Sequence, residues 1–276
     1  MMGLRYPPLS PPLTPSNTHK AVQDVLSRAR LTVIHSEELP NHLHQITLLR
    51  LSDGSRLILK TDPPPISALL RSEYTYLHAE ATILELLATS SLTIPRILRY
   101  ERKAHPLDSS FLLTTCLPGV YYSNVEEHLT KVQRKNIDRN IESCSSNLGK
   151  YRSHTFGPAG LVKAGRGFKG WKEAFTAMLE SVMMDGEDIM VNLPYYQIRE
   201  AISRWESYLE AVTEARLVVP DLRQKQNILI DRRSAEVTGL LDFGKAFWGD
   251  VEMYDQREDG NIKGLLYGLL LSCIDF

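Results

Sequence analysis

Residues Val218 to Asp250 read VVPDLRQKQNILIDRRSAEVTGLLDFGKAFWGD. Two apolar runs in this stretch, NILID and VTGLLDF, are joined by Arg232-Arg233-Ser234, and this pattern predicts a hairpin. Asn227 stands at one end of the hairpin and Asp242 at the other, so strand pairing brings the two polar side chains together. Carboxylate and amide oxygens are hard ligands suited to Mg²⁺, which completes its octahedron with phosphate oxygens. The stretch therefore predicts a metal–phosphate site, with Asp221 placed just upstream to accept a hydroxyl proton.

Length and composition bound the class of protein. The chain has 276 residues, which is long for one domain and sufficient for two lobes that share a cleft. Apolar residues make up 43% and charged residues 24%, the ordinary balance of a globular protein. Lys and Arg number 32 against 33 Asp and Glu, so no broad basic field exists for a nucleic-acid backbone. Neither a nucleic-acid partner nor a membrane partner is expected.

The two ends of the chain and the cysteines bear on location. The first twenty residues, MMGLRYPPLSPPLTPSNTHK, are rich in Pro and Ser and lack an apolar core of signal-peptide length, so residues 1–20 are predicted to be a flexible arm. The apolar tail GLLYGLLLSCIDF is too short to span a bilayer and favours a buried terminal helix. Cys116, Cys144 and Cys273 form neither a CxxC pair nor a disulfide framework. A reducing, cytoplasmic location is expected.

The rest of the chain divides into a β-rich and a helical part. The segment HQITLLRLSDGSRLILK alternates apolar and polar positions around Asp53-Gly54, which predicts a hairpin whose second strand ends at Lys60. The segment LLRSEYTYLHAEATILELLATS has helical spacing and contains Glu80. Two strand-like runs follow, TIPRILRYER and SSFLLTTCLPG. We therefore expect a small β-rich lobe over 21–119 and, from the long helical patterns after Tyr122, a helical lobe over 120–276.

This order of elements resembles the aminoglycoside phosphotransferase-like family of the protein-kinase-like fold. DFGKAFWGD is similar to the metal-binding segment of that family, and LILK to the strand whose Lys contacts the nucleotide phosphates. The segment LLRSEYTYLHAEATILELL is similar to the helix whose Glu pairs with that Lys, FLLTTCLPG to the hinge, and FGPAG with GWKEAFTAML to the helical lobe. The resemblance covers roughly 31–255 and implies an α+β, bilobal protein-kinase-like fold.

The resemblance also implies an activity and roles for particular residues. The activity is an ATP-dependent transfer of the γ-phosphate to a hydroxyl of a small molecule, with ATP and Mg²⁺ as cofactors. In this interpretation Lys60 and Glu80 hold the phosphates, Asn227 and Asp242 hold the metal, and Asp221 orients the acceptor hydroxyl. The adenine hinge consists of four consecutive residues: Thr114, Thr115, Cys116 and Leu117.

Three departures from the family pattern favour an alternative. Val219-Pro220 precedes Asp221 where the family usually has a His or an aromatic residue, and the segment between Asp221 and Asn227 is one residue longer than usual. No glycine occurs between Val33 and Ser52, where the turn over the phosphates is expected, so Asn41 is the predicted substitute. The chain also stops soon after residues 248–250, as a divergent and C-terminally short member would. The alternative is a catalytically impaired pseudokinase that binds a nucleotide or a partner; other chemistry on the same fold stays open, because fold does not fix function.

Two further assignments were weighed. Glu73 is an alternative partner for Lys60, but Glu80 is preferred, because it precedes an Ala-Thr-Ile-Leu run in the way that the Glu of the resembled family does. The histidines, including His42, His44 and His154, show neither HxxxH nor HExxH spacing. They are interpreted as ordinary surface or core residues.

Overall fold

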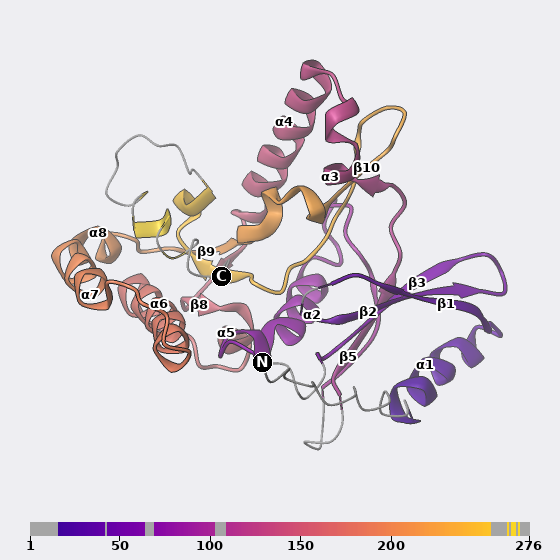
Figure 1. The fold of residues 1–276 in the computed structure, drawn as a ribbon, viewed down its shortest axis with the longest axis horizontal. Helices are drawn as coiled ribbons and strands as arrows, with labels where there is room; N and C mark the ends of the chain where they lie inside the picture. The colour runs from indigo at the N-terminus through magenta and orange to yellow at the C-terminus, as the bar shows by residue number, and fades with distance from the viewer. Residues whose placement is uncertain are drawn as a thin grey trace, which may run out of the picture.

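The computed structural model describes residues 16–41, 43–63, 69–102 and 109–254, together with 264, 266–268 and 270 of the terminal segment. The chain folds into two lobes (Figure 1). The strands of the N-terminal lobe lie at the lower right of the view, and α6 (Trp171–Asp188) of the C-terminal lobe lies on the left, with α2 (Tyr76–Leu86) between them. Helix α4 (Lys131–Leu148), also of the C-terminal lobe, stands at the top. The predicted bilobal α+β architecture is confirmed.

The N-terminal lobe is built on a five-stranded antiparallel sheet. Its strands are β1 (Val33–Leu39), β2 (Gln45–Leu51), β3 (Arg56–Thr61), β4 (Ile97–Glu101) and β5 (Phe111–Thr115), in the order β1-β2-β3-β5-β4. The predicted hairpin is β2–β3, whose register pairs Gln45 with Thr61 and Ile46 with Lys60. Gly54 takes a φ of 83° at its turn, a left-handed conformation that glycine adopts without strain.

Helices cover both faces of this sheet. Helix α1 (Ser16–Arg28) packs Val22 and Leu26 against a cluster that includes Leu57, Leu59 and Leu113. Helix α2 (Tyr76–Leu86), preceded by the short helix η1 (Glu73–Thr75), buries its apolar residues in the large core shared with the C-terminal lobe. The start of α1 at Ser16 corrects the prediction that residues 1–20 form a flexible arm, because residues 16–20 are helical; residues 1–15 lie outside the described residues.

The C-terminal lobe contains two small antiparallel sheets. Strands β6 (Val120–Tyr121), β10 (Ile228–Ile230) and β11 (Val237–Leu240) form one, in the order β11-β10-β6. Strands β7 (Arg152–Ser153), β8 (Gly157–Pro158), β9 (Ala215–Val218) and β12 (Phe247–Gly249) form the other, in the order β7-β9-β12-β8. The predicted hairpin of the Val218–Asp250 stretch is β10–β11. The chain thus leaves the N-terminal sheet after β5 and joins a C-terminal sheet at Val120.

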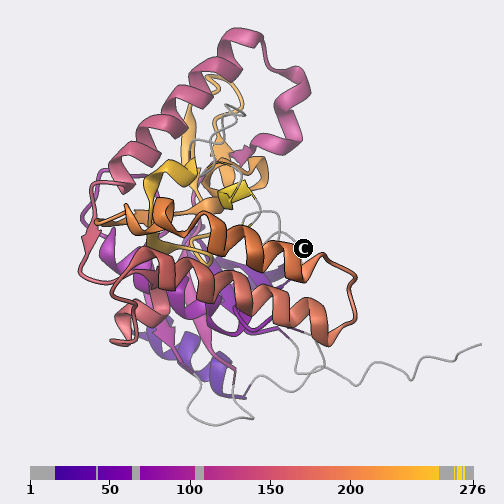
Figure 2. The same cartoon turned by 90° about the vertical axis from the view of Figure 1, so that its left-hand side faces the viewer.

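Helices make up the rest of the C-terminal lobe: α3 (Tyr122–Val125), α4 (Lys131–Leu148), α5 (Ala159–Lys163), α6 (Trp171–Asp188), α7 (Tyr195–Arg204) and α8 (Glu206–Glu210). A capping box between Thr130 and Gln133 begins α4. Helices α6 and α7 run side by side (Figure 2), and Arg199 donates to Glu180 at 2.9 Å across them. The helical sequence pattern that begins at Tyr195 forms two helices, α7 and α8, and the break between them is at Trp205.

The terminal segment contributes to the core. Leu266, Tyr267 and Leu270 are helical and buried, as expected for the apolar tail. The Tyr267 hydroxyl donates to Asp250 Oδ2 at 2.7 Å and accepts from Trp171 Nε1 at 3.1 Å, which connects the segment to α6 and to the residue that follows β12. Within the described residues, no helix is both long and apolar enough to cross a membrane.

Candidate active site

A buried ion pair joins the sheet to helix α2. Lys60 Nζ, on β3, donates to Glu80 Oε1 at 2.7 Å and to Oε2 at 2.9 Å. Burial by itself would lower the pKa of Lys60, but the Glu80 carboxylate and, next, Asp242 outweigh it and raise the pKa above its ordinary value. Lys60 is thus paired with the Glu80 carboxylate and lies within the electrostatic field of Asp242. Glu73 does not take this place, because its Oε2 accepts from the backbone N–H of Leu70 at 2.7 Å.

The β10–β11 hairpin brings Asn227 and Asp242 to one end. Ile228 pairs with Leu240 in the hairpin. Beyond this pair, the Leu241 N–H donates to the Asn227 carbonyl at 2.8 Å, and Asp242 is the next residue in the chain. Asp242 has a φ of 61°, an uncommon backbone conformation for a residue other than glycine. Backbone strain of this kind concentrates at functional sites.

The donor set suits a magnesium ion that is shared with phosphates. Asn227 is buried, and its Nδ2 donates to the Asp221 backbone carbonyl at 3.2 Å, which leaves Oδ1 as the atom that could hold a metal ion. Asp242 Oδ1 accepts from the Gly244 N–H at 3.3 Å. In the part of the chain that the structure describes, no three His, Cys, Asp or Glu side chains converge on one point. Two protein oxygens with the remaining positions left to water and phosphate is the pattern that Mg²⁺ prefers.

Asp221 lies in the short helix η3 (Pro220–Arg223), beneath this site. Its side chain is buried; Oδ1 accepts from Gln224 Nε2 at 3.0 Å, and Oδ2 lies 3.2 Å from Lys245 Nζ. The longer loop closes as two successive turns of 3₁₀ helix, η3 and η4 (Lys225–Asn227), which accommodate the additional residue. Lys245 belongs to the DFGKAF segment, and its contact with Asp221 was not predicted from the sequence.

Of the four predicted hinge residues, Thr114 and Thr115 end β5, and Cys116 and Leu117 follow it. Thr114 is buried within the sheet, whereas the backbone N–H groups of Thr115 and Cys116 donate to the carbonyls of Arg96 at 2.9 Å and Arg56 at 3.2 Å. Since Pro118 has no N–H, the Leu117 N–H is the remaining backbone donor of this segment that could face a ligand. Of the predicted hinge residues, Thr115 and Cys116 thus use their amides within the protein.

The β1–β2 turn has a different construction from a glycine-rich turn. Asn41 Oδ1 accepts from the N–H groups of Leu43 and His44, both at 2.9 Å. Two amides of the turn are therefore satisfied by a side chain, as in other Asx turns. His44 comes next in the chain; the sequence interpretation treated it as ordinary, and His42 lies outside the described residues.

A cavity of about 220 Å³ lies beside Lys245, between the start of α2, α5, α6 and the segment 244–247. Apolar side chains from several elements form most of its wall, among them Ala79, Leu161, Phe168, Met178, Val182 and Phe247. Its charged lining residues within the described part of the chain are Arg71 and Lys245. Since Lys245 also contacts Asp221, the cavity adjoins the carboxylate.

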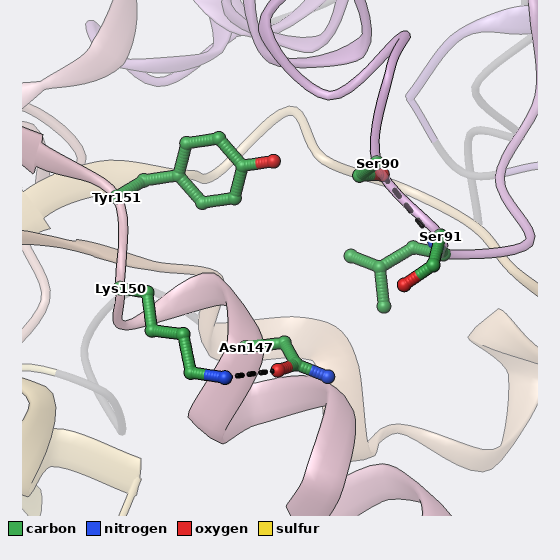
Figure 3. A pocket seen from close by; sticks show the side chains of 6 residues that line it. Ser90, Ser91, Asn147, Lys150 and Tyr151 are labelled. Carbon is green, nitrogen blue, oxygen red and sulfur yellow. Dashed lines mark hydrogen bonds between the residues drawn. The ribbon is translucent and has the colours of Figure 1, made fainter.

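A second hollow lies where α2 and α4 end (Figure 3). Lys150 and Tyr151 line it together with Ser90 and Ser91, and the Lys150 ammonium donates to Asn147 Oδ1 at 2.7 Å. The carboxyl ends of two helices favour a cation, which Lys150 already supplies. This hollow is separate from the Lys60–Asp242 site and offers no comparable set of reactive groups.

Comparison with known proteins agrees with this geometry. Residues 38–253 match the phosphotransferase enzyme family. The crystal structure of aminoglycoside phosphotransferase APH(4)-Ia is similar with a TM-score of 0.65 and 15% identity, over 95% of this chain and 90% of that chain. The streptomycin–ATP–APH(2")-IIa ternary complex is similar with a TM-score of 0.58 and 12% identity, over 88% of this chain and 74% of that chain.

A search of curated proteins found no match. At the identities above, the structural likeness establishes the fold, which is the protein-kinase-like fold that the sequence predicts. The family match is independent of it and covers more than half of the sequence. The chain therefore belongs to the phosphotransferase enzyme family.

Proposed function

We propose that the protein is an ATP-dependent kinase that transfers the γ-phosphate to a hydroxyl of a small molecule. The observation that carries the proposal is the buried Lys60–Glu80 pair with Asp242 close enough to raise the pKa of Lys60. Taking charged groups out of water is costly, and an ion pair offsets that cost only in part. A triphosphate with its metal ion is a ligand that uses the ammonium and the second carboxylate together.

Each predicted residue then has a task in the reaction. Lys60 binds phosphate oxygens, and Glu80 fixes the position of its ammonium. Asn227 Oδ1 and Asp242 hold Mg²⁺, which when bound neutralises the charge that develops on the transferred group. The hinge binds adenine through the Leu117 N–H.

Asp221 orients the acceptor hydroxyl and receives its proton. Its two oxygens are already in contact with Gln224 and Lys245, so the carboxylate has a fixed orientation before the acceptor arrives. Preorganised groups of this kind lower the barrier because they need no rearrangement during the reaction. The same contacts also suit the alternative, a protein that binds nucleotide without transferring phosphate, and the two functions require separate tests.

The first test is a thermal-shift titration with ATP, with and without Mg²⁺. A ligand that binds only the folded chain raises the melting temperature by mass action. We expect a shift that requires Mg²⁺ and is lost in Asp242→Ala, with Asp24→Ala on the exposed face of α1 as the matched control. The absence of a shift in the wild-type protein at millimolar ATP would contradict nucleotide binding altogether. A thermal shift without ³²P transfer to any hydroxyl compound in a broad screen would favour the alternative function, a pseudokinase that binds nucleotide without transferring phosphate.

We further propose that the cavity beside Lys245 receives an apolar part of the acceptor. Comparison proteins were solved with hygromycin B or streptomycin, but an apolar wall with Arg71 and Lys245 as its described charged residues does not suit a polycationic amino sugar. A cavity of about 150 Å³ holds benzene, so about 220 Å³ admits a somewhat larger apolar group. The expected acceptor is an alcohol that carries an aromatic ring or a branched alkyl group.

Filling the cavity tests this placement. Ala177→Phe on α6 should lower kcat/KM for the acceptor by at least about tenfold, because the apolar group loses its space, while the Mg²⁺–ATP thermal shift stays the same. Met184→Phe, at an exposed position of the same helix, is the control. An unchanged kcat/KM in Ala177→Phe would place the acceptor elsewhere.

A further inference from the structure

The cavity beside Lys245 has two chemically different walls. The wall that comes from α5, α6 and the segments around them is mostly apolar. Residues 71–76, which lead into α2, bring polar groups instead, and Arg71, Ser72, Thr75 and Tyr76 all line the cavity. In a mostly apolar pocket, a few placed polar groups orient the ligand and provide specificity. The polar wall therefore bears on which acceptor the cavity selects.

Tyr76 brings this polar wall close to the candidate active site. It is the first residue of α2, and a Cβ added to Gly244 would lie 3.1 Å from Tyr76 Cβ and 3.4 Å from Asp242 Oδ1. The start of α2 thus packs directly on the segment that follows Asp242. Burial raises the pKa of the Tyr76 phenol, and among the smaller contributions Lys245 lowers it and Asp221 raises it. The phenol is therefore neutral at physiological pH and lies within the electrostatic field of the Lys245–Asp221 pair.

The Tyr76 hydroxyl forms a pair with a second hydroxyl of the same wall. Tyr76 Oη and Ser72 Oγ lie 3.0 Å apart, and either atom can donate to the other. Each hydroxyl carries one hydrogen, so a hydrogen bond between them uses one hydrogen and leaves the other. Within the described part of the chain, no further hydrogen bond joins either hydroxyl to the protein. The pair can therefore donate one hydrogen bond to a group in the cavity.

The charges of the cavity favour an uncharged group at this position. Lys245 Nζ lies 3.2 Å from Asp221 Oδ2, and Arg71 contacts both Asp185 and Asp188. Carboxylates of the protein thus balance both cations of the cavity. A charged group of the acceptor would lose its hydration against the apolar wall without gaining a partner of opposite charge.

We propose that Tyr76, together with Ser72, is a specificity-determining residue that donates a hydrogen bond to an uncharged oxygen of the acceptor. In this arrangement the apolar body of the acceptor lies against α6, its second oxygen faces the start of α2, and its reacting hydroxyl faces Asp221. The acceptor class is therefore an apolar alcohol that carries a second oxygen function, such as an ether, a carbonyl or another hydroxyl. This inference rests on the proposed function, since it requires that the cavity receives the acceptor of a phosphate transfer.

The test uses matched probe alcohols with the full chain, Mg²⁺ and ATP. The probes are phenylethyl alcohols that carry a methoxy group at the ortho, meta or para position, and each is compared with the analogue that carries an ethyl group there. The two members of a pair have nearly the same shape and differ by one ether oxygen. The measured quantity is the ratio of their kcat/KM values for ³²P transfer.

Two variants remove the proposed donor. Tyr76→Phe keeps the ring and removes its hydroxyl, and the double variant with Ser72→Ala removes both hydroxyls. A hydrogen bond between neutral groups predicts that the ratio of methoxy to ethyl probe falls by roughly threefold to tenfold for at least one ring position. Tyr74→Phe, which removes the hydroxyl of an exposed tyrosine just before α2, is the matched control and should leave the ratio as in the wild type.

The ratio distinguishes specificity from a structural role. If the hydroxyl pair merely stabilises the start of α2, its removal lowers the melting temperature or the kcat/KM of both probes alike, and the ratio does not change. An unchanged ratio in the folded double variant would overturn the role of Tyr76 while the proposed function stands. The same conclusion follows if the wild-type chain phosphorylates other hydroxyl compounds but none of these probes. A wild-type chain that transfers phosphate to no hydroxyl compound at all would overturn the proposed function together with this inference.

Discussion

At the scale of single residues, Asp221 separates catalysis from binding. Asp221→Asn keeps the size of the side chain and can still contact Gln224, but it cannot accept the hydroxyl proton. General-base assistance contributes about a hundredfold to ten-thousandfold, so kcat should fall by a factor in that range. The Mg²⁺–ATP thermal shift should stay near the wild-type value, because Asp221 does not bind the nucleotide. Turnover at the wild-type rate would show that another group receives the proton.

His44 also predicts a dependence of stability on pH. Its pKa is about 4 in the folded chain and about 6.5 when unfolded, so between these values the unfolded chain binds more protons and stability falls as the pH falls. Complete loss of this contribution corresponds to roughly 3 kcal/mol at most. The free energy of unfolding of wild type minus that of His44→Asn should therefore decrease from pH 7 to pH 4. Urea titrations measure it, and a difference that is constant across this range would contradict the buried, neutral imidazole.

At the scale of elements, the start of the C-terminal lobe depends on Gly119. Gly119 has a φ of 125°, and a Cβ there would meet Thr238 Oγ1 at 2.4 Å and the Ile230 carbonyl at 2.9 Å. Gly119→Ala should lower the free energy of unfolding by about 3 kcal/mol, from backbone strain and overpacking together. Gly54→Ala is the control, because its φ of 83° adds strain but no atom lies within 4 Å of the added Cβ. Equal losses in the two variants would show that the close approach to β10 and β11 costs nothing.

The same scale shows how far sequence patterns reach. Alternation and the Asp-Gly turn were sufficient for β2–β3, and the two apolar runs around Arg232 for β10–β11, because each hairpin is specified by neighbours in the chain. The break between α7 and α8 at Trp205 has no Gly or Pro to mark it. It accompanies tertiary contacts, in which Lys172 of α6 binds both Glu206 at 2.8 Å and Glu210 at 2.7 Å.

The same distinction, between neighbours in the chain and contacts between distant segments, applies to the candidate site. Asp221, Asn227 and Asp242 were predicted as site residues because they lie in one short stretch whose spacing carries information. The proximity of Lys245 to Asp221 was not predicted, since it depends on a contact between separate segments of the chain.

At the scale of the whole molecule, a polar contact joins the two lobes next to the cavity beside Lys245. Arg71, just before η1, contacts Asp185 and Asp188 of α6, and Asp185 Oδ2 also accepts from the Arg71 backbone N–H at 3.0 Å. Asp185 is buried, whereas the side chain of Asp188 is 64% exposed. Partners that are buried and bonded to the backbone contribute more than exposed ion pairs, which contribute little.

The two aspartates therefore form a matched pair of variants. Asp185→Ala leaves a backbone N–H and the guanidinium without their buried acceptor, and it should lower the free energy of unfolding by about 2 kcal/mol. It should also raise KM for the acceptor, because Arg71 lines the cavity, without changing the Mg²⁺–ATP thermal shift. Asp188→Ala should leave both quantities nearly unchanged. A larger effect of Asp188→Ala would contradict the role of the buried Asp185 in fixing α6 against the N-terminal lobe. Weaker nucleotide binding in Asp185→Ala, with KM for the acceptor unchanged, would contradict the proposed link between this contact and the cavity beside Lys245.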